Sequence, residues 1–143
     1  MTFKTVCRTA RRVSPPEWVY PSLLSDLRAL HFDTHGVDYV LDVKNFSETC
    51  YGRYYPAKKR VRVYYACHKD YAHLVDTAIH EVCHHIQHSD KDFVRVKGVM
   101  HNEQFWTLYN HYSAEFQRQY KARRLLHIAK RIEESRRVYS YSH

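Results

Sequence analysis

The chain has 143 residues, of which 44% are hydrophobic, and a formal net charge of +8. This length suffices for one domain with its own core and excludes a separate regulatory domain. Its 13 tyrosines argue against a disordered chain, and no apolar run has the length of a membrane span or a signal peptide. We therefore expect a soluble, globular protein without a membrane partner, in an intracellular, cytoplasmic setting.

The positive charge is concentrated at the two ends of the chain. Residues 1–12 contain four basic and no acidic side chains, and residues 118–143 contain eight basic and two acidic ones. Basic ends on a nearly neutral body favour a polyanionic partner, so DNA is a candidate partner through both termini. We expect a basic arm at 1–15, a folded domain at 16–120 and a basic helix or tail at 121–143. A solvated surface or an acidic protein partner is the alternative.

Helices and strands are predicted along the chain before residue 70. Pro21 and the leucines after it predict a short helix that ends between 31 and 36. Strands are expected at 37–43, 49–55 and 60–65. Because the last strand precedes the helix described next, its open edge could pair with an extended peptide. The alternative is an ordinary edge strand that its arginines protect from aggregation.

Residues 78–88 contain His80-Glu81-Val82-Cys83-His84, the His-Glu-x-x-His pattern of zinc peptidases. Apolar residues recur around it at helical spacing, and two histidines four positions apart on a helix can reach one metal ion from the same face. Glu81 lies beside that face, where its carboxylate can take a proton from water. Cys83 points away from the two ligands and is expected to be a small buried residue, since no Cys-x-x-Cys pair indicates a zinc ribbon.

A catalytic zinc site needs a third protein ligand from elsewhere in the chain. We favour His101, which stands at the start of the next predicted helix. Glu103 resembles the glutamate that thermolysin-like sites supply from a following helix. Asp90 occupies the last ligand position of the pattern His-Glu-x-x-His-x-x-Gly-x-x-His/Asp, but Gln87 replaces the glycine of that pattern. His88 lies about 12 Å along the helix axis from His80, which is too far for a shared ion.

The helix after residue 101 is expected to begin at His101 or Asn102. Its apolar stripe is predicted to lie against the body of the domain and contains Phe105, Tyr109, Tyr112, Phe116 and Tyr120. Beyond Tyr120 the stripe turns basic, so the helix either breaks or runs past the body. In the second case its candidate phosphate contacts are Arg123, Arg124, Lys130 and Arg131.

The sequence resembles the SprT-like zinc metallopeptidases over roughly residues 20–115. The resemblance rests on Tyr51-Gly52-Arg53-Tyr54, the strand at 60–65, the motif at 80–84 and His101-Asn102-Glu103-Gln104-Phe105-Trp106. It implies that His80, His84 and His101 bind zinc and that Glu81 is the general base. Asn102 replaces the usual glycine, and the zinc-ribbon tail of some members is absent. Some relatives cleave proteins crosslinked to DNA.

The expected fold is therefore α+β: a zincin-like single domain with a small antiparallel or mixed sheet of about three strands, an active-site helix and a long C-terminal helix. The expected function is zinc-dependent hydrolysis of peptide bonds in a protein or peptide substrate, with DNA-associated proteins as candidate substrates. Glu81 favours this enzyme, because a structural metal site does not need a base beside its ligands. The alternative is a non-catalytic, zinc-stabilised nucleic-acid-binding or virion structural protein. Tyr109, His111 and Tyr112 are candidates for stabilising the oxyanion.

Overall fold

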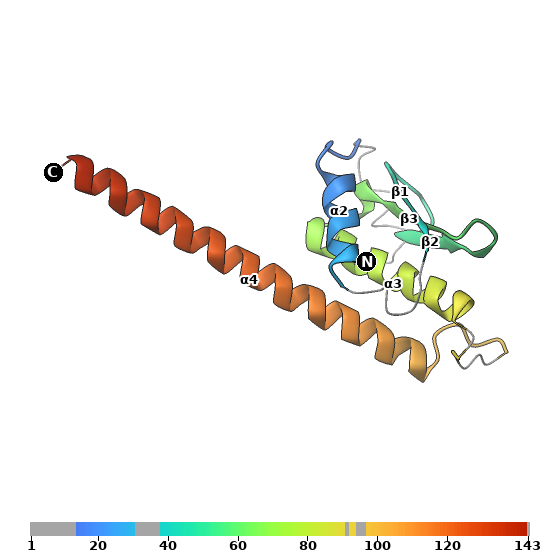
Figure 1. The fold of residues 1–143 in the computed structure, drawn as a ribbon. Helices are drawn as coiled ribbons and strands as arrows, with labels where there is room; N and C mark the ends of the chain where they lie inside the picture. The colour runs from blue at the N-terminus through green and yellow to red at the C-terminus, as the bar shows by residue number, and fades with distance from the viewer. Residues whose placement is uncertain (1–13, 31–37, 91, 94–96, 143) are drawn as a thin grey trace.

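A computed structural model describes residues 14–30, 38–90, 92–93 and 97–142, with side chains placed up to residue 138. Of the predicted arm at 1–15, residues 1–13 lie outside these residues. The first helix ends at Arg28, earlier than the predicted end between 31 and 36. The helices and strands in chain order are α2 (Val19–Arg28), β1 (Val40–Lys44), β2 (Gly52–Tyr55), the 3-10 turn η2 (Pro56–Lys58), β3 (Arg60–Tyr64), the 3-10 turn η3 (Tyr65–Cys67), α3 (Tyr71–Ser89) and α4 (Glu103–Ser142), as Figure 1 shows.

The three strands form one mixed sheet in the order β1-β3-β2, in which β1 is parallel and β2 antiparallel to β3. The fold is therefore α+β, with a mixed sheet of three strands as predicted. The expectation of an open edge on the strand at 60–65 is wrong, because β3 is the central strand and both of its edges are paired. The outer strands β1 and β2 each have one unpaired edge, and the short η2 turn after β2 reverses the chain into β3.

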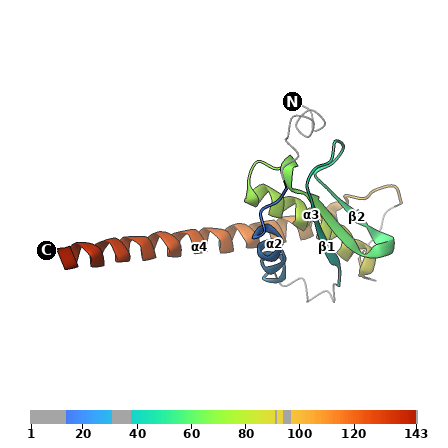
Figure 2. The ribbon, with the colours of Figure 1, turned by 90° about the horizontal axis from the view of Figure 1, so that it is seen from above.

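Helix α3 covers one face of the sheet and forms the centre of the core. Val61 and Val63 of β3 point toward it, since alternate residues of a strand face the same side, and both are fully buried. Figure 2 shows that α2 lies at one side of the sheet, next to β1 and α3. The α2 and α3 side chains that complete the core are Val19, Leu23, Leu27, Leu74, Val75, Ala78, Ile79, Val82 and Ile86.

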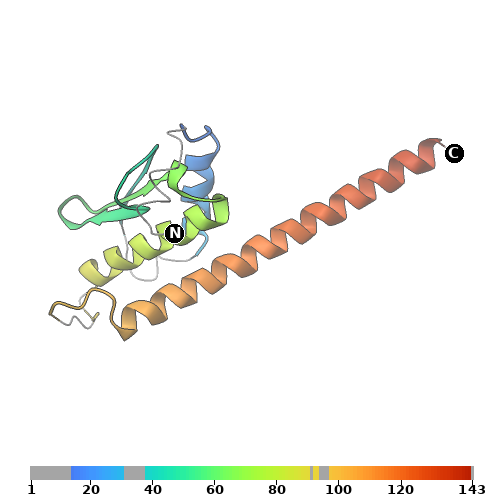
Figure 3. The ribbon, with the colours of Figure 1, turned by 180° about the vertical axis from the view of Figure 1, so that it is seen from behind.

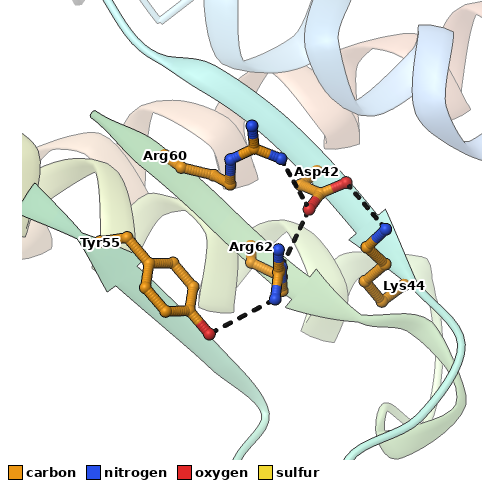
Figure 4. A network of polar contacts seen from close by, with 5 residues as sticks. All are labelled: Asp42, Lys44, Tyr55, Arg60 and Arg62. Atoms are coloured by element: carbon orange, nitrogen blue, oxygen red, sulfur yellow. Dashed lines mark hydrogen bonds and ion pairs between the residues drawn. The ribbon is translucent and has the colours of Figure 1, made fainter. Parts of the chain in front are cut away.

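The opposite face of the sheet carries a polar network (Figure 4). Asp42 of β1 accepts hydrogen bonds from Arg62 Nε at 2.9 Å and from Arg60 at 3.3 Å. Partial burial would raise the pKa of Asp42, but the arginines and Lys44 outweigh it and lower that pKa. Arg62 also contacts Tyr55 of β2, so the network links all three strands. The arginines of β3 thus stabilise a central strand.

Helix α4 is a single helix of 40 residues that runs past the body of the domain. Phe105, Tyr112 and Phe116 are buried against α3, which confirms that the predicted stripe belongs to the core. After Tyr120 every residue up to 138 is exposed, and Figure 3 shows this half of the helix extending away from the other elements. No described helix combines the length and the apolar character needed to cross a membrane.

Candidate metal centre

Helix α3 positions three of the predicted site residues. Its first turn is capped by Asp70, whose side chain accepts a hydrogen bond from the backbone N–H of His73 at 2.9 Å. The apolar side of α3 faces the sheet, and its C-terminal half therefore presents a second side with His80 and His84, one helical turn apart. Glu81 lies between these two sides and is also buried.

The three predicted histidine ligands converge on one point. Nε2 of His101 lies 3.1 Å from Nε2 of His84 and 3.2 Å from Nε2 of His80. Zinc bound tetrahedrally at about 2.05 Å from each nitrogen would hold its ligand nitrogens about 3.3 Å apart. Two of the three nitrogen pairs therefore have a spacing close to that of one zinc ion, and all three ligand atoms lie within 4.8 Å of one another. The cluster comes from the three residues that sequence reasoning favoured.

His101 reaches the cluster because the start of α4 is fixed next to it. The side chain of Asn102 accepts a hydrogen bond from the backbone N–H of Phe105 at 2.9 Å and caps the helix. The aromatic ring of Phe105 stacks on His84 at 4.6 Å and contacts His101 at 4.9 Å between ring centroids. Asn102, in the position where a glycine was expected, thus caps the helix that begins directly after the candidate ligand His101 and Asn102 itself.

Burial favours the neutral form of two candidate ligands, His80 and His84, and the neutral form is the one that can bind a metal ion. Burial lowers the pKa of His80 to about 4, with a smaller contribution from the nearby imidazoles of His84 and His101. Burial is also the main reason that the pKa of His84 is lowered. The lone pairs of both side chains are thus available at neutral pH without the loss of a proton.

Gln87 fixes the orientation of His84 and was not singled out by the sequence. Its side-chain N–H donates to the carbonyl of Met100 at 2.9 Å, so the amide oxygen faces His84. Nδ1–H of His84 donates to that oxygen at 3.1 Å, which leaves Nε2 unprotonated toward the cluster. The only sequence signal is its spacing three residues after His84, which places the two side chains on the same helix face.

Glu81 is only 8% exposed, and burial raises the pKa of its carboxyl to about 7, against a smaller opposing effect of Arg53. It is buried by β2, which approaches α3 closely at Gly52. A Cβ at Gly52 would lie 2.7 Å from Cγ2 of Thr77, 2.9 Å from the carbonyl of Arg62 and 3.3 Å from Cγ of Glu81. Only glycine allows this approach.

A cleft of about 710 Å³ opens over the histidine cluster and Glu81. One wall is β2 with Pro56 after it, and another is the segment from Val99 to His101. The hydroxyl of Tyr54 lies 2.6 Å from Nδ1 of His85 and hydrogen-bonds to it, which joins β2 to α3 beside the cleft. The cleft therefore places a candidate metal-binding cluster, a buried carboxyl and an edge strand next to each other.

The alternative ligands lie outside the cluster. Asp90 follows α3 and lines a different pocket, Glu103 is exposed on the first turn of α4, and His88 lines the cleft without joining the three nitrogens. Cys83 is fully buried, as expected.

The three oxyanion candidates do not line the cleft either. Tyr109 donates its hydroxyl hydrogen to Asp76 at 2.6 Å, whereas His111 and Tyr112 line the pocket near Asp90. Among the described residues, the arginine that lines the cleft is Arg53, on the edge strand β2. The sequence feature that could have pointed to Arg53 is its place in the Tyr51-Gly52-Arg53-Tyr54 run, on which the family resemblance partly rests.

Comparisons of this chain with protein-family models, with curated proteins and with solved structures gave no match.

Proposed function

We propose that this protein is a zinc-dependent endopeptidase of the zincin type, similar to the SprT-like metallopeptidases. The observation that carries the proposal is the convergence of three Nε2 atoms, 3.1 and 3.2 Å apart in two of the three pairs, beside the buried carboxyl of Glu81. Imidazoles from His80, His84 and His101 suit zinc in number and chemistry and leave one position open.

Zinc bound there would lower the pKa of a water molecule to about 7 and polarise a carbonyl group. Glu81 accepts the proton of the attacking water and later gives it to the leaving amine. Its pKa of about 7 in the metal-free protein suits both steps, since neither the acid nor the base form is strongly disfavoured near neutral pH. Positive charge from the metal would lower this pKa.

The cleft supports a peptide as substrate. The free edge of β2 lines it, so an extended peptide could add to the sheet by main-chain hydrogen bonds next to Glu81. This assigns to β2 the substrate-binding role that the sequence suggested for the strand at 60–65. Arg53 lines the same cleft, and its guanidinium is the candidate group for stabilising negative charge on the substrate.

The proposal is tested by comparing the wild-type protein with Glu81→Gln. Both are loaded with zinc, and both are incubated with an unfolded protein and with a short fluorogenic peptide. We expect one zinc per chain in both proteins and a rate at least about 100-fold lower in the variant, because a general base is lost and no ligand is. The matched control is Glu103→Gln, which removes an exposed glutamate outside the cluster and should leave the rate unchanged.

The same experiment separates the enzyme from a zinc-stabilised structural protein. A structural site predicts full zinc occupancy, loss of folding when a chelator is added and no hydrolysis by the wild-type protein. That outcome would contradict the proposed peptidase.

A further inference from the structure

A second concave site lies where α4 leaves the body of the domain. It is a groove of about 460 Å³ between Trp18, at the start of α2, and the stretch of α4 from Tyr120 to Arg131. Tyr71, at the start of α3, contributes to its floor. Tyr71 precedes His84 by 13 residues on α3, so the groove is about 20 Å from the metal cluster. It is thus separate from the candidate active site.

The floor of the groove holds the root of the projecting helix in place. Asp26 is 8% exposed and accepts hydrogen bonds from the Tyr71 hydroxyl at 2.5 Å and from Arg123 at 2.8 Å. Arg123, one of the four cations that the sequence suggested as phosphate contacts, therefore already has a carboxylate partner within the domain. Its charge and that of Asp26 offset each other.

The cations that remain free in the groove lie on one face of α4. Arg124 and Arg131 both line the groove, seven residues apart and thus two helical turns along the same face. Within the described residues neither forms an ion pair. His127 lies between them on the same wall. The groove therefore offers two guanidinium groups about 10 Å apart along the helix axis, without a buried carboxylate left to neutralise them.

An aromatic side chain lines the same groove as these cations. Trp18 is 52% exposed, although its ring contacts Tyr71 edge-on at 5.5 Å between centroids. Half of a large indole surface is therefore available beside two free arginines. A positively charged groove with an exposed aromatic ring is the arrangement by which proteins bind single-stranded nucleic acid, with phosphates on the cations and bases stacked on the ring.

We propose that this groove binds single-stranded nucleic acid, with phosphates at Arg124 and Arg131 and a base stacked on Trp18. Duplex DNA fits less well, because its bases are stacked inside the helix and cannot reach the indole face. A membrane surface also fits less well, because an interfacial helix inserts its apolar face, whereas α4 contributes a mainly cationic face to a concave groove.

The test measures binding of the full chain to a fluorescently labelled 12-nucleotide oligothymidylate at several salt concentrations. Replacing Arg124 and Arg131 by Gln should weaken binding by about tenfold or more and flatten the slope of log affinity against log salt by about 1.4, since two phosphate contacts are lost. The matched control replaces Lys130 and Arg136 by Gln. These residues lie on the same exposed half of α4 but outside the groove, and the control should change affinity less than threefold.

Stacking is tested separately at Trp18. Trp18→Ala should weaken binding by about tenfold with an unchanged salt slope, and Trp18→Phe should retain most of the affinity. The chain has two tryptophans, so quenching of fluorescence on binding should persist in Trp106→Phe and vanish in Trp18→Phe. Circular dichroism and zinc content, equal in all variants, establish that folding and the metal centre are unaffected.

Several outcomes would overturn the proposal. Equal loss in the groove pair and the control pair would show diffuse attraction to a charged helix instead of a site. Tighter binding to a duplex of the same length, or binding to phosphatidylserine vesicles without binding to the oligonucleotide, would assign the surface to another partner. Binding of thymidine monophosphate as tight as that of the 12-mer would show a mononucleotide site. Because none of these readouts uses peptide hydrolysis, they are independent of the proposed peptidase.

Discussion

Nδ1–H of His84 donates a hydrogen bond to the side-chain oxygen of Gln87 at 3.1 Å. The other end of the same amide donates to the carbonyl of Met100, next to His101 in the chain. One side chain therefore sets the tautomer of a candidate ligand on α3 and holds the segment that supplies another. Such outer partners usually contribute 10- to 100-fold to the metal affinity of a site.

Gln87→Leu should accordingly weaken zinc binding by about 10- to 100-fold, measured by competition with a chromophoric chelator. Gln87→Glu keeps an oxygen for His84 but loses the donor to Met100, so it should bind zinc more tightly than Gln87→Leu. The exposed Gln117, on α4, provides the control, and Gln117→Leu should behave as the wild type. Equal zinc affinity in Gln87→Leu and the wild type would show that the hydrogen bond does not orient the ligand.

His101→Ala should reduce zinc affinity by more than about 100-fold, because it removes a direct ligand and not an outer partner. Glu103→Ala should leave the affinity within about threefold of the wild type, since Glu103 is exposed and outside the cluster. The zinc content of each variant after dialysis measures both changes in affinity. Zinc retained by His101→Ala and lost by Glu103→Ala would instead indicate a thermolysin-like site.

The metal-free protein should become less stable relative to Glu81→Gln as the pH rises. The pKa of Glu81 is raised to about 7 by burial in the folded state, above its ordinary value of 4.5, so the folded state binds this proton more tightly. The resulting stability is complete below pH 4.5 and is lost as the pH rises through about 7. Glu81→Gln has no titrating group at this position. Its free energy of unfolding should therefore rise relative to that of the wild-type protein by about 2 to 3 kcal/mol between pH 5 and pH 8.

Urea unfolding of both metal-free proteins at these two pH values measures the difference. Other titrating groups are common to both proteins, so their effects largely cancel in the comparison. A difference that stays constant between pH 5 and pH 8 would contradict the raised pKa.

Gly52→Ala should lower the free energy of unfolding by about 1 to 3 kcal/mol, because the new methyl group would overlap Thr77 and the carbonyl of Arg62. Thermal or urea unfolding measures it. Thr77→Ser removes the methyl group of Thr77 and keeps the hydroxyl that bonds to His68, so adding it to Gly52→Ala should recover part of the loss. No recovery would place the strain at the backbone carbonyl alone.

The local part of this structure was predictable from the sequence because it depends on neighbours within a few residues. Helical spacing determines that His80 and His84 share a face of α3, and Asn102 caps α4 through its own side chain. The apolar stripe that begins with Phe105 likewise indicates which side of α4 is buried. His101 was favoured as the third ligand on chemical grounds, and the structure places it with the other two histidines.

Tertiary structure decided what depends on residues far apart in the chain. Strand order is one example: the alternating sequence of β3 fits an edge or a centre equally well, and only the pairing with β1 and β2 makes it central. Pairing of Arg123 with Asp26, 97 residues away, is another, since sequence alone shows Arg123 as one cation among several. Both outcomes follow from long-range packing, in which the partner of a side chain is fixed by the path of the whole chain and not by its neighbours.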